Sequence, residues 1–86
     1  MNLKSKLPED KAFYVQNGPV IKSLQELAEA LENDSISDDA FRFHLGNNNN
    51  DFINWINGVY GDQDLVKALK RVKTKKGFAK KLNEVV

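Results

Sequence analysis

The side chains that could carry out catalysis are few in this chain. It has a single histidine, His44, together with four serines, one threonine and no cysteine. Nucleophilic catalysis needs a nucleophile, an adjacent base and a group that orients the base, and no such set stands out. His44 lies just before Gly46, where a helix end would favour a protonated imidazole and where Asp51 or an asparagine of the next turn could form a hydrogen bond with it. We therefore predict a structural histidine and a protein that is not an enzyme.

The chain also lacks the ligand sets of common metal and phosphate sites. A zinc site needs about four nitrogen or sulfur ligands, or three and a water, which one histidine without cysteine cannot supply. Asp38-Asp39 and Asp62-Gln63-Asp64 lack the alternating ligand series of a calcium loop. The five glycines form no phosphate-binding motif. We expect no metal, no cofactor and no catalytic residues.

The charged residues are distributed unevenly along this sequence. Residues 1–65 hold five Lys/Arg against eleven Asp/Glu, a balance of −6, whereas residues 66–86 hold eight against one, a balance of +7. An acidic body with a basic end is typical of proteins that bind a polyanion or an acidic surface. The alternative is a solvated helix face that complements the acidic body of its own molecule.

The basic residues follow helical spacing. They recur at intervals of three and four residues, opposite the apolar stripe of the same stretch. No base-reading motif accompanies them, and the segment has almost no aromatic residue for stacking on bases. Any contact with DNA or RNA would therefore be with the backbone and sequence-tolerant. The predicted polyanion-binding residues are Lys67, Lys70, Arg71, Lys73, Lys76, Lys80 and Lys81.

Other partners stay open. An acidic protein surface could bind the same ridge over residues 67–81. The alternative function is a protein-interaction or adaptor domain without a nucleic-acid role, which could self-associate head to tail through its unlike charges. Its candidate faces are the acidic helix side with Glu26, Glu29 and Glu32 and the edge at Phe13 and Tyr14.

A membrane is the weakest candidate partner, because the core needs the apolar residues of the basic last helix. No apolar run approaches the roughly 18 residues of a membrane span. The Met-Asn-Leu-Lys start is not followed by the apolar region of a secretory signal. We therefore expect a cytoplasmic protein.

Short helices should position these residues. With 86 residues, 41% apolar and 29% charged, the chain is typical of one small globular domain. Apolar residues repeat at helical spacing in several stretches, and a residue that can cap a helix precedes each of them. The predicted helices follow Ser23 up to Asn33, run from Ser37 to Gly46 and from about Asp51 to Tyr60, and follow the caps Asp62 and Thr74.

The N-terminal part of the chain lacks these helical patterns. We predict a flexible arm over residues 1–11 and a single helical domain over residues 12–86 with basic C-terminal helices. Ala12 to Gln16 and Val20-Ile21 flank the turn Asn17-Gly18-Pro19 and could pair as a β-hairpin. The predicted fold is mainly α: a compact domain of four to five helices, with a short N-terminal β-hairpin as an option.

The third helix carries apolar residues on more than one face, so we expect it to be the most enclosed element. Its Trp55 is expected in the core rather than as an anchor for a partner. Gly77 should weaken the last helix by about 1 kcal/mol relative to alanine.

Several short sequence segments resemble those of a known family. The most distinctive are Phe41 with His44, then Asn50-Asp51-Phe52 with Trp55-Ile56, and Gly61-Asp62 after them. In these parts the chain resembles an uncharacterised prokaryotic family, frequent in archaea, of small helical domains of unknown function. The resemblance runs from Phe13 to Leu69, about two thirds of the chain. It implies a helical fold and a prokaryotic origin, and it implies neither a reaction nor a site.

Overall fold

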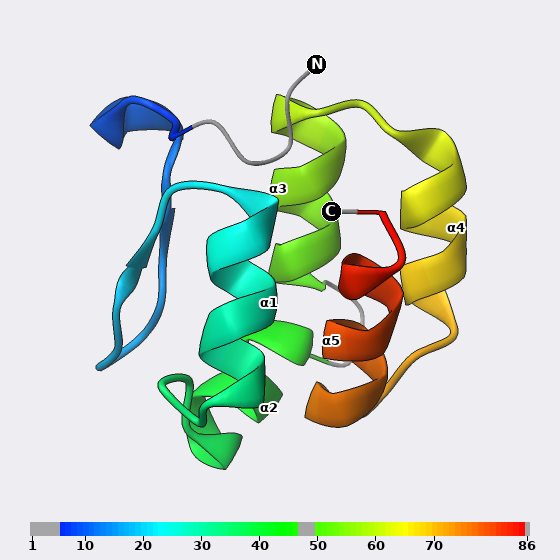
Figure 1. Ribbon diagram of the computed structural model, residues 1–86. Coiled ribbons are helices and arrows are strands. Elements are labelled where there is room, and N and C mark those ends of the chain that lie inside the picture. The colour runs from blue at the N-terminus through cyan, green and yellow to red at the C-terminus, as the bar shows by residue number, and fades with distance from the viewer. Residues whose placement is uncertain (1–5, 47–49, 86) are drawn as a thin grey trace.

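The computed structural model describes residues 6–46 and 50–85. Within them, the predicted mainly α fold with a short N-terminal β-hairpin is confirmed (Figure 1). Two antiparallel strands precede the helices, with Phe13 opposite Ile21 and Tyr14 opposite Val20. The elements in chain order are the 3-10 turn η1 (Glu9–Lys11), β1 (Phe13–Tyr14), β2 (Val20–Ile21), α1 (Leu24–Glu32), α2 (Asp38–Leu45), α3 (Asp51–Val59), α4 (Gln63–Lys70) and α5 (Lys75–Asn83).

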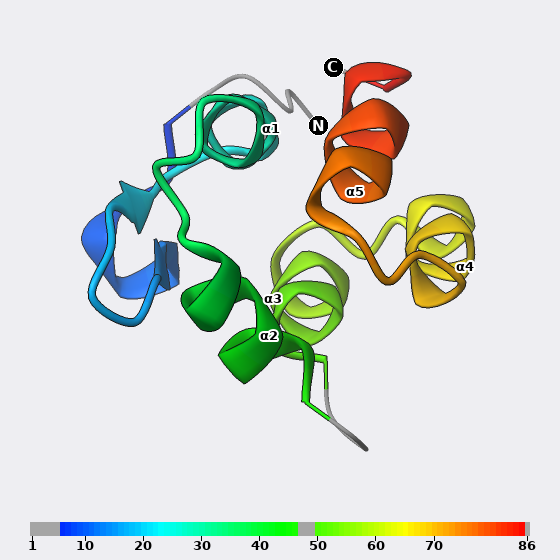
Figure 2. The same ribbon diagram turned by 90° about the horizontal axis from the view of Figure 1, so that it is seen from below.

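The hairpin and α4 lie at opposite ends of the molecule, with α1, α3 and α5 between them (Figures 1 and 2). The basic helices α4 and α5 are therefore neighbours, far from the β-hairpin. α5 also packs along α1, its most extensive partner. The packing thus brings the acidic first helix beside the basic last one.

Each helix begins at a polar side chain that the sequence marks as a cap. Every cap oxygen accepts a hydrogen bond of 3.0–3.2 Å from the backbone N–H three residues later, an interaction worth about 1 kcal/mol. At α1 the Glu26 carboxylate accepts from the Lys22 N–H at 3.0 Å, one residue earlier than a capping box requires. The five caps are Ser23, Ser37, Asn50, Asp62 and Thr74.

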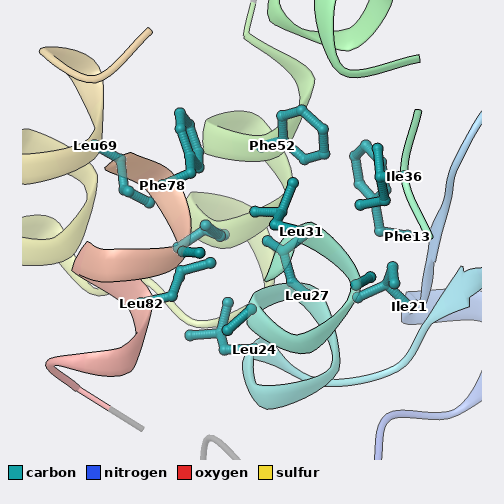
Figure 3. Packing of buried hydrophobic residues seen from close by; sticks show 14 of the residues in the cluster. Phe13, Ile21, Leu24, Leu27, Leu31, Ile36, Phe52, Leu69, Phe78 and Leu82 are labelled. Carbon is teal, nitrogen blue, oxygen red and sulfur yellow. The ribbon is translucent and has the colours of Figure 1, made fainter. Parts of the chain in front are cut away.

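The core forms where the apolar stripes of α1, α3 and α5 meet (Figure 3). α1 is the most enclosed helix, with five of its nine residues buried against three of nine in α3. The prediction for α3 is therefore wrong. The reason is position, because α1 contacts the hairpin strand β2 on one side and α5 on the other.

Trp55 lies at the edge of the core and is only partly buried, so its expected core position is correct only in part. Its ring packs edge-on against Phe13 with centroids 5.6 Å apart. Its indole N–H donates to the carbonyl of Lys11 at 2.7 Å. An amphipathic ring that keeps its polar atom bonded suits this half-exposed position.

The described part of the expected arm contacts the helical body. Residues 1–5 and Val86 lie outside the described residues. The Leu7 N–H donates to the Lys22 carbonyl at 2.7 Å, and the Lys6 ammonium lies 2.8 Å from the Glu26 carboxylate. That hydrogen bond from Lys6 lowers the pKa of Glu26 below its ordinary range. Residues 6–11 therefore connect to the start of α1 and, through Lys11, to α3.

Gly77 sits where no larger residue fits without a shift. A Cβ there would lie 2.7 Å from Val72 Cγ1 and 2.9 Å from Thr74 Oγ1. The helix-weakening glycine thus allows the turn before α5 to pack closely onto that helix.

Candidate polyanion-binding surface

α4, α5 and the turn between them position the seven predicted cationic residues. The apolar stripes of both helices face the core, including the fully buried Leu69, Phe78 and Leu82. The basic residues between these positions are therefore turned outward. Six are exposed, and Lys81 is half-buried.

Four of the seven residues come together beside α4. Lys67, Lys70, Arg71 and Lys81 line a hollow of about 670 Å³, here called the α4 hollow, together with Ala68 and Val72. None of the described residues contributes a carboxylate to its lining. In residues 6–46 and 50–85, no carboxylate oxygen lies within 4.0 Å of a charged nitrogen of Lys67, Lys70 or Arg71. In the same residues, Glu84 has the one carboxylate within 4.0 Å of the Lys81 ammonium, at 3.9 Å.

The other three predicted residues border a different hollow. Lys73, Lys76 and Lys80 line a groove of about 930 Å³, here called the α5 groove, between α5, the end of α1 and α2. Four carboxylates share this lining, those of Glu32, Asp34, Asp38 and Glu84. The predicted ridge over residues 67–81 is therefore divided between two hollows with different electrostatics.

Lys75, which the predicted set leaves out, lies within the α5 groove and is largely buried. Its side chain is 12% exposed, and its ammonium lies 2.8 Å from Asp34 and 3.1 Å from Asp38. The hydrogen bond with Asp34 raises the pKa of Lys75 and lowers that of Asp34. Lys75 therefore links α5 to the α1–α2 connection, and here the basic end does complement the acidic body.

His44 is buried and bonded at both ring nitrogens. The backbone N–H of Gln16 donates to Nε2 at 2.9 Å, and Nδ1 lies 3.0 Å from the Asp51 carboxylate. Because Nε2 accepts a hydrogen bond, the ring proton resides on Nδ1 and is donated to Asp51. Its expected contact with Asp51 is confirmed, and the link to the hairpin through Gln16 is an addition. His44 thus joins the hairpin to α3.

The described residues hold no cluster of three or more His, Cys, Asp or Glu side chains that could bind a metal ion. None of the helices in these residues is long and apolar enough to cross a membrane. The apolar residues Phe78 and Leu82 of the basic last helix are fully buried in the core. Phe78 and Leu82 are therefore not exposed to a partner, and the exposed groups of α5 are mainly its charged side chains.

No protein-family model, curated protein or solved structure matches this chain. The resemblance to a prokaryotic family of helical domains stays a prediction.

Proposed function

We propose that this protein is a non-catalytic binding module that holds the phosphate backbone of DNA or RNA in the α4 hollow. The supporting observation is the group of four cationic side chains there, to whose lining the described residues add no carboxylate. Each phosphate that a lysine or arginine neutralises releases condensed counterions, which drives association at low salt. A hollow lined by one sign of charge also concentrates the electrostatic potential that attracts a polyanion.

Recognition in this hollow is independent of base sequence. Beside the cations, its lining offers only Ala68 and Val72, which are too small for base stacking. The exposed aromatic residues of the described chain are Tyr14 and Phe43, on β1 and α2 rather than on the basic helices. Backbone contact is therefore the mode that the available side chains support.

Fluorescence anisotropy with two labelled DNA duplexes of unrelated sequence tests this function. If four cations contact phosphates, log affinity falls with log salt at a slope of about −3.6, equally for both sequences. Changing Lys67, Lys70 and Arg71 to Gln leaves one contact and a slope of about −0.9.

A matched control changes Lys11, Lys22 and Arg42 to Gln, which removes the same three charges from the acidic body. This control is expected to keep the slope of the unaltered protein. If both triple variants lose the same affinity, only net charge matters and the hollow is not the site. Phosphate contacts are strong at low salt, about 50 mM. If the unaltered protein binds neither duplex under that condition, the proposal is wrong.

Protein interaction is a second candidate function, favoured by apolar side chains away from the basic helices. Tyr14 and Val20 pair across the hairpin and are both exposed, and Phe43 is 59% exposed. A self-associating protein would show a mass in light scattering that rises with concentration and falls back in the Tyr14→Ser, Phe43→Ser variant. A constant monomer mass would argue against self-association through these residues.

A further inference from the structure

The carboxylates of the α5 groove are already occupied by partners within the protein. Two bind one buried ammonium, one accepts a hydrogen bond from an amide, and one lies beside a lysine of the α4 hollow. The pairs are Asp34 and Asp38 with Lys75, Glu32 with Asn83, and Glu84 with Lys81.

Three cations of the same groove have no such partner. Across residues 6–46 and 50–85, no carboxylate oxygen lies within 4.0 Å of the ammonium groups of Lys73, Lys76 or Lys80. All three side chains are exposed. The lining holds two other cations: Lys75 is paired with Asp34 and Asp38, and Arg42 is paired with Asp39 at 2.7 Å. Five cations and four carboxylates thus line the groove, and the three cations without a paired carboxylate are exposed at its surface.

The groove also offers apolar surface, which the α4 hollow has only in two small residues. Leu31, Phe41 and Ala79 contribute to its lining from α1, α2 and α5, which meet where α1 ends and α5 begins (Figure 1). Each of the three is almost fully buried, so the floor is narrow. The aliphatic stems of the rim lysines can extend it, because lysine side chains cover apolar surface while their ammonium groups stay in water.

We propose that the α5 groove binds a small amphiphilic anion, a carboxylate with an unbranched apolar chain. The carboxylate lies among the ammonium groups of Lys73, Lys76 and Lys80, and the chain lies along the floor at Phe41 and Ala79. A volume of about 930 Å³ is in the range of pockets that hold small organic ligands. This site does not depend on nucleic-acid binding, because it uses different cations, so either proposal can fail alone.

The unaltered chain, labelled with ¹⁵N, tests the site by NMR titration with sodium decanoate below its micelle concentration. Two further probes separate the parts of the recognition: decyltrimethylammonium has the same chain with the opposite charge, and inorganic phosphate has the charge without the chain. Decanoate is expected to give saturable shifts at the backbone amides of Phe41, Lys76 and Ala79. The other two probes are expected to leave these amides unshifted at equal concentration.

A pair of triple variants then tests the lysines. Changing Lys73, Lys76 and Lys80 to Gln is expected to weaken decanoate binding about tenfold, since exposed ion pairs each contribute modestly. The same change at Lys67, Lys70 and Arg71 should alter it less than about twofold, because at physiological salt charges beyond roughly 8 Å are screened. The comparison of probes needs no variant, so it stands even if one variant folds poorly.

Three results would overturn the proposal. Equal binding of decyltrimethylammonium would show that chain burial alone drives association. Equal shifts with phosphate would show a site for charge without an apolar part. If a glutamate-rich peptide shifts the amides of the groove and decanoate does not, the occupant is an acidic peptide rather than a small amphiphile.

Discussion

The two sides of α5 carry the same kind of residue in opposite electrostatic settings. On the side toward α4, Lys81 joins Lys67, Lys70 and Arg71 around a hollow that no carboxylate of residues 6–46 and 50–85 lines. On the side toward α1 and α2, Lys76 and Lys80 share a groove with four carboxylates. The comparison shows that a count of charges along the chain does not give the field at the surface. Tertiary packing decides which charges are compensated.

The difference separates two kinds of ligand. A highly charged polymer gains most where cations are grouped and few carboxylates oppose them, as in the α4 hollow, where Glu84 lies 3.9 Å from Lys81. A small anion with an apolar part gains from a groove that offers both a few free ammonium groups and some apolar surface. The two proposals for this protein follow from that division.

Charge reversal should produce the largest difference in duplex affinity between variants of the two hollows. Changing Lys67, Lys70 and Arg71 to Glu is expected to weaken duplex binding at 50 mM salt by at least about a hundredfold, because contacts become repulsions. The same reversal at Lys73, Lys76 and Lys80 should cost on the order of tenfold, through its longer-range field alone. Fluorescence anisotropy measures both. Equal losses in the two variants would erase the distinction between the hollows.

Replacing Gly77 should disturb both hollows through the turn between them. In Gly77→Ala the new methyl group would clash with Val72 of the α4 hollow and with the cap Thr74. We expect the free energy of unfolding to fall by about 1–2 kcal/mol, the steric cost exceeding the gain in helix propensity.

The matched control for that change is Gly58→Ala, since nothing lies within 4 Å of a Cβ at Gly58 in α3. It should stabilise the protein by up to about 1 kcal/mol. Urea unfolding measures both variants. A stabilised Gly77→Ala protein would show that the turn does not need its close packing.

Removing Lys75 should have a smaller effect, confined to the α5 side. Lys75→Met leaves Asp34 and Asp38 without their shared ammonium. The pair lowers the pKa of Asp34 below its ordinary 3.8 and raises that of Lys75 above 10.5. Its contribution to stability is therefore present between these values, lost as pH falls through the lowered pKa and lost again as pH rises through the raised one.

The midpoint of urea unfolding should thus decrease modestly at pH 7 in Lys75→Met and change little at pH 2. Duplex binding should stay close to that of the unaltered protein, apart from the loss of one charge. An unchanged midpoint at pH 7 would show that the pair contributes nothing to folding.

The helices of this protein could be predicted because their signals are local. Every cap is a side chain three residues before the N–H that it bonds, and Gly46, with its positive φ of 60°, ends α2 as expected. The apolar stripes likewise repeat within one helix. Such features need no knowledge of the neighbouring elements.

The core contained residues that local patterns could not indicate. Ile36 is fully buried, yet it lies in the connection between α1 and α2, outside any helical repeat. Phe43, an apolar residue in α2, is exposed because the helix turns Phe41 and His44 inward instead. Burial here depends on how the elements pack.

The division of the cationic residues between two hollows also depends on how the elements pack, so the sequence alone did not indicate it. Lys76, Lys80 and Lys81 are close in sequence, but their positions around α5 place them in different hollows. The acids that accompany two of them come from the end of α1, the α1–α2 connection, the start of α2 and the residue after α5. That the cations lie on α4, α5 and the turn between them could be predicted from the sequence, and how they divide between two hollows could not.

The most direct test of the central claim is an NMR titration of the ¹⁵N-labelled chain with a short DNA duplex at low salt. The account predicts that the largest shifts fall on amides lining the α4 hollow, at Lys67, Lys70 and Arg71, and decrease in step as salt is added. Shifts centred on Lys73, Lys76 and the α5 groove, or no shifts at all, would contradict it.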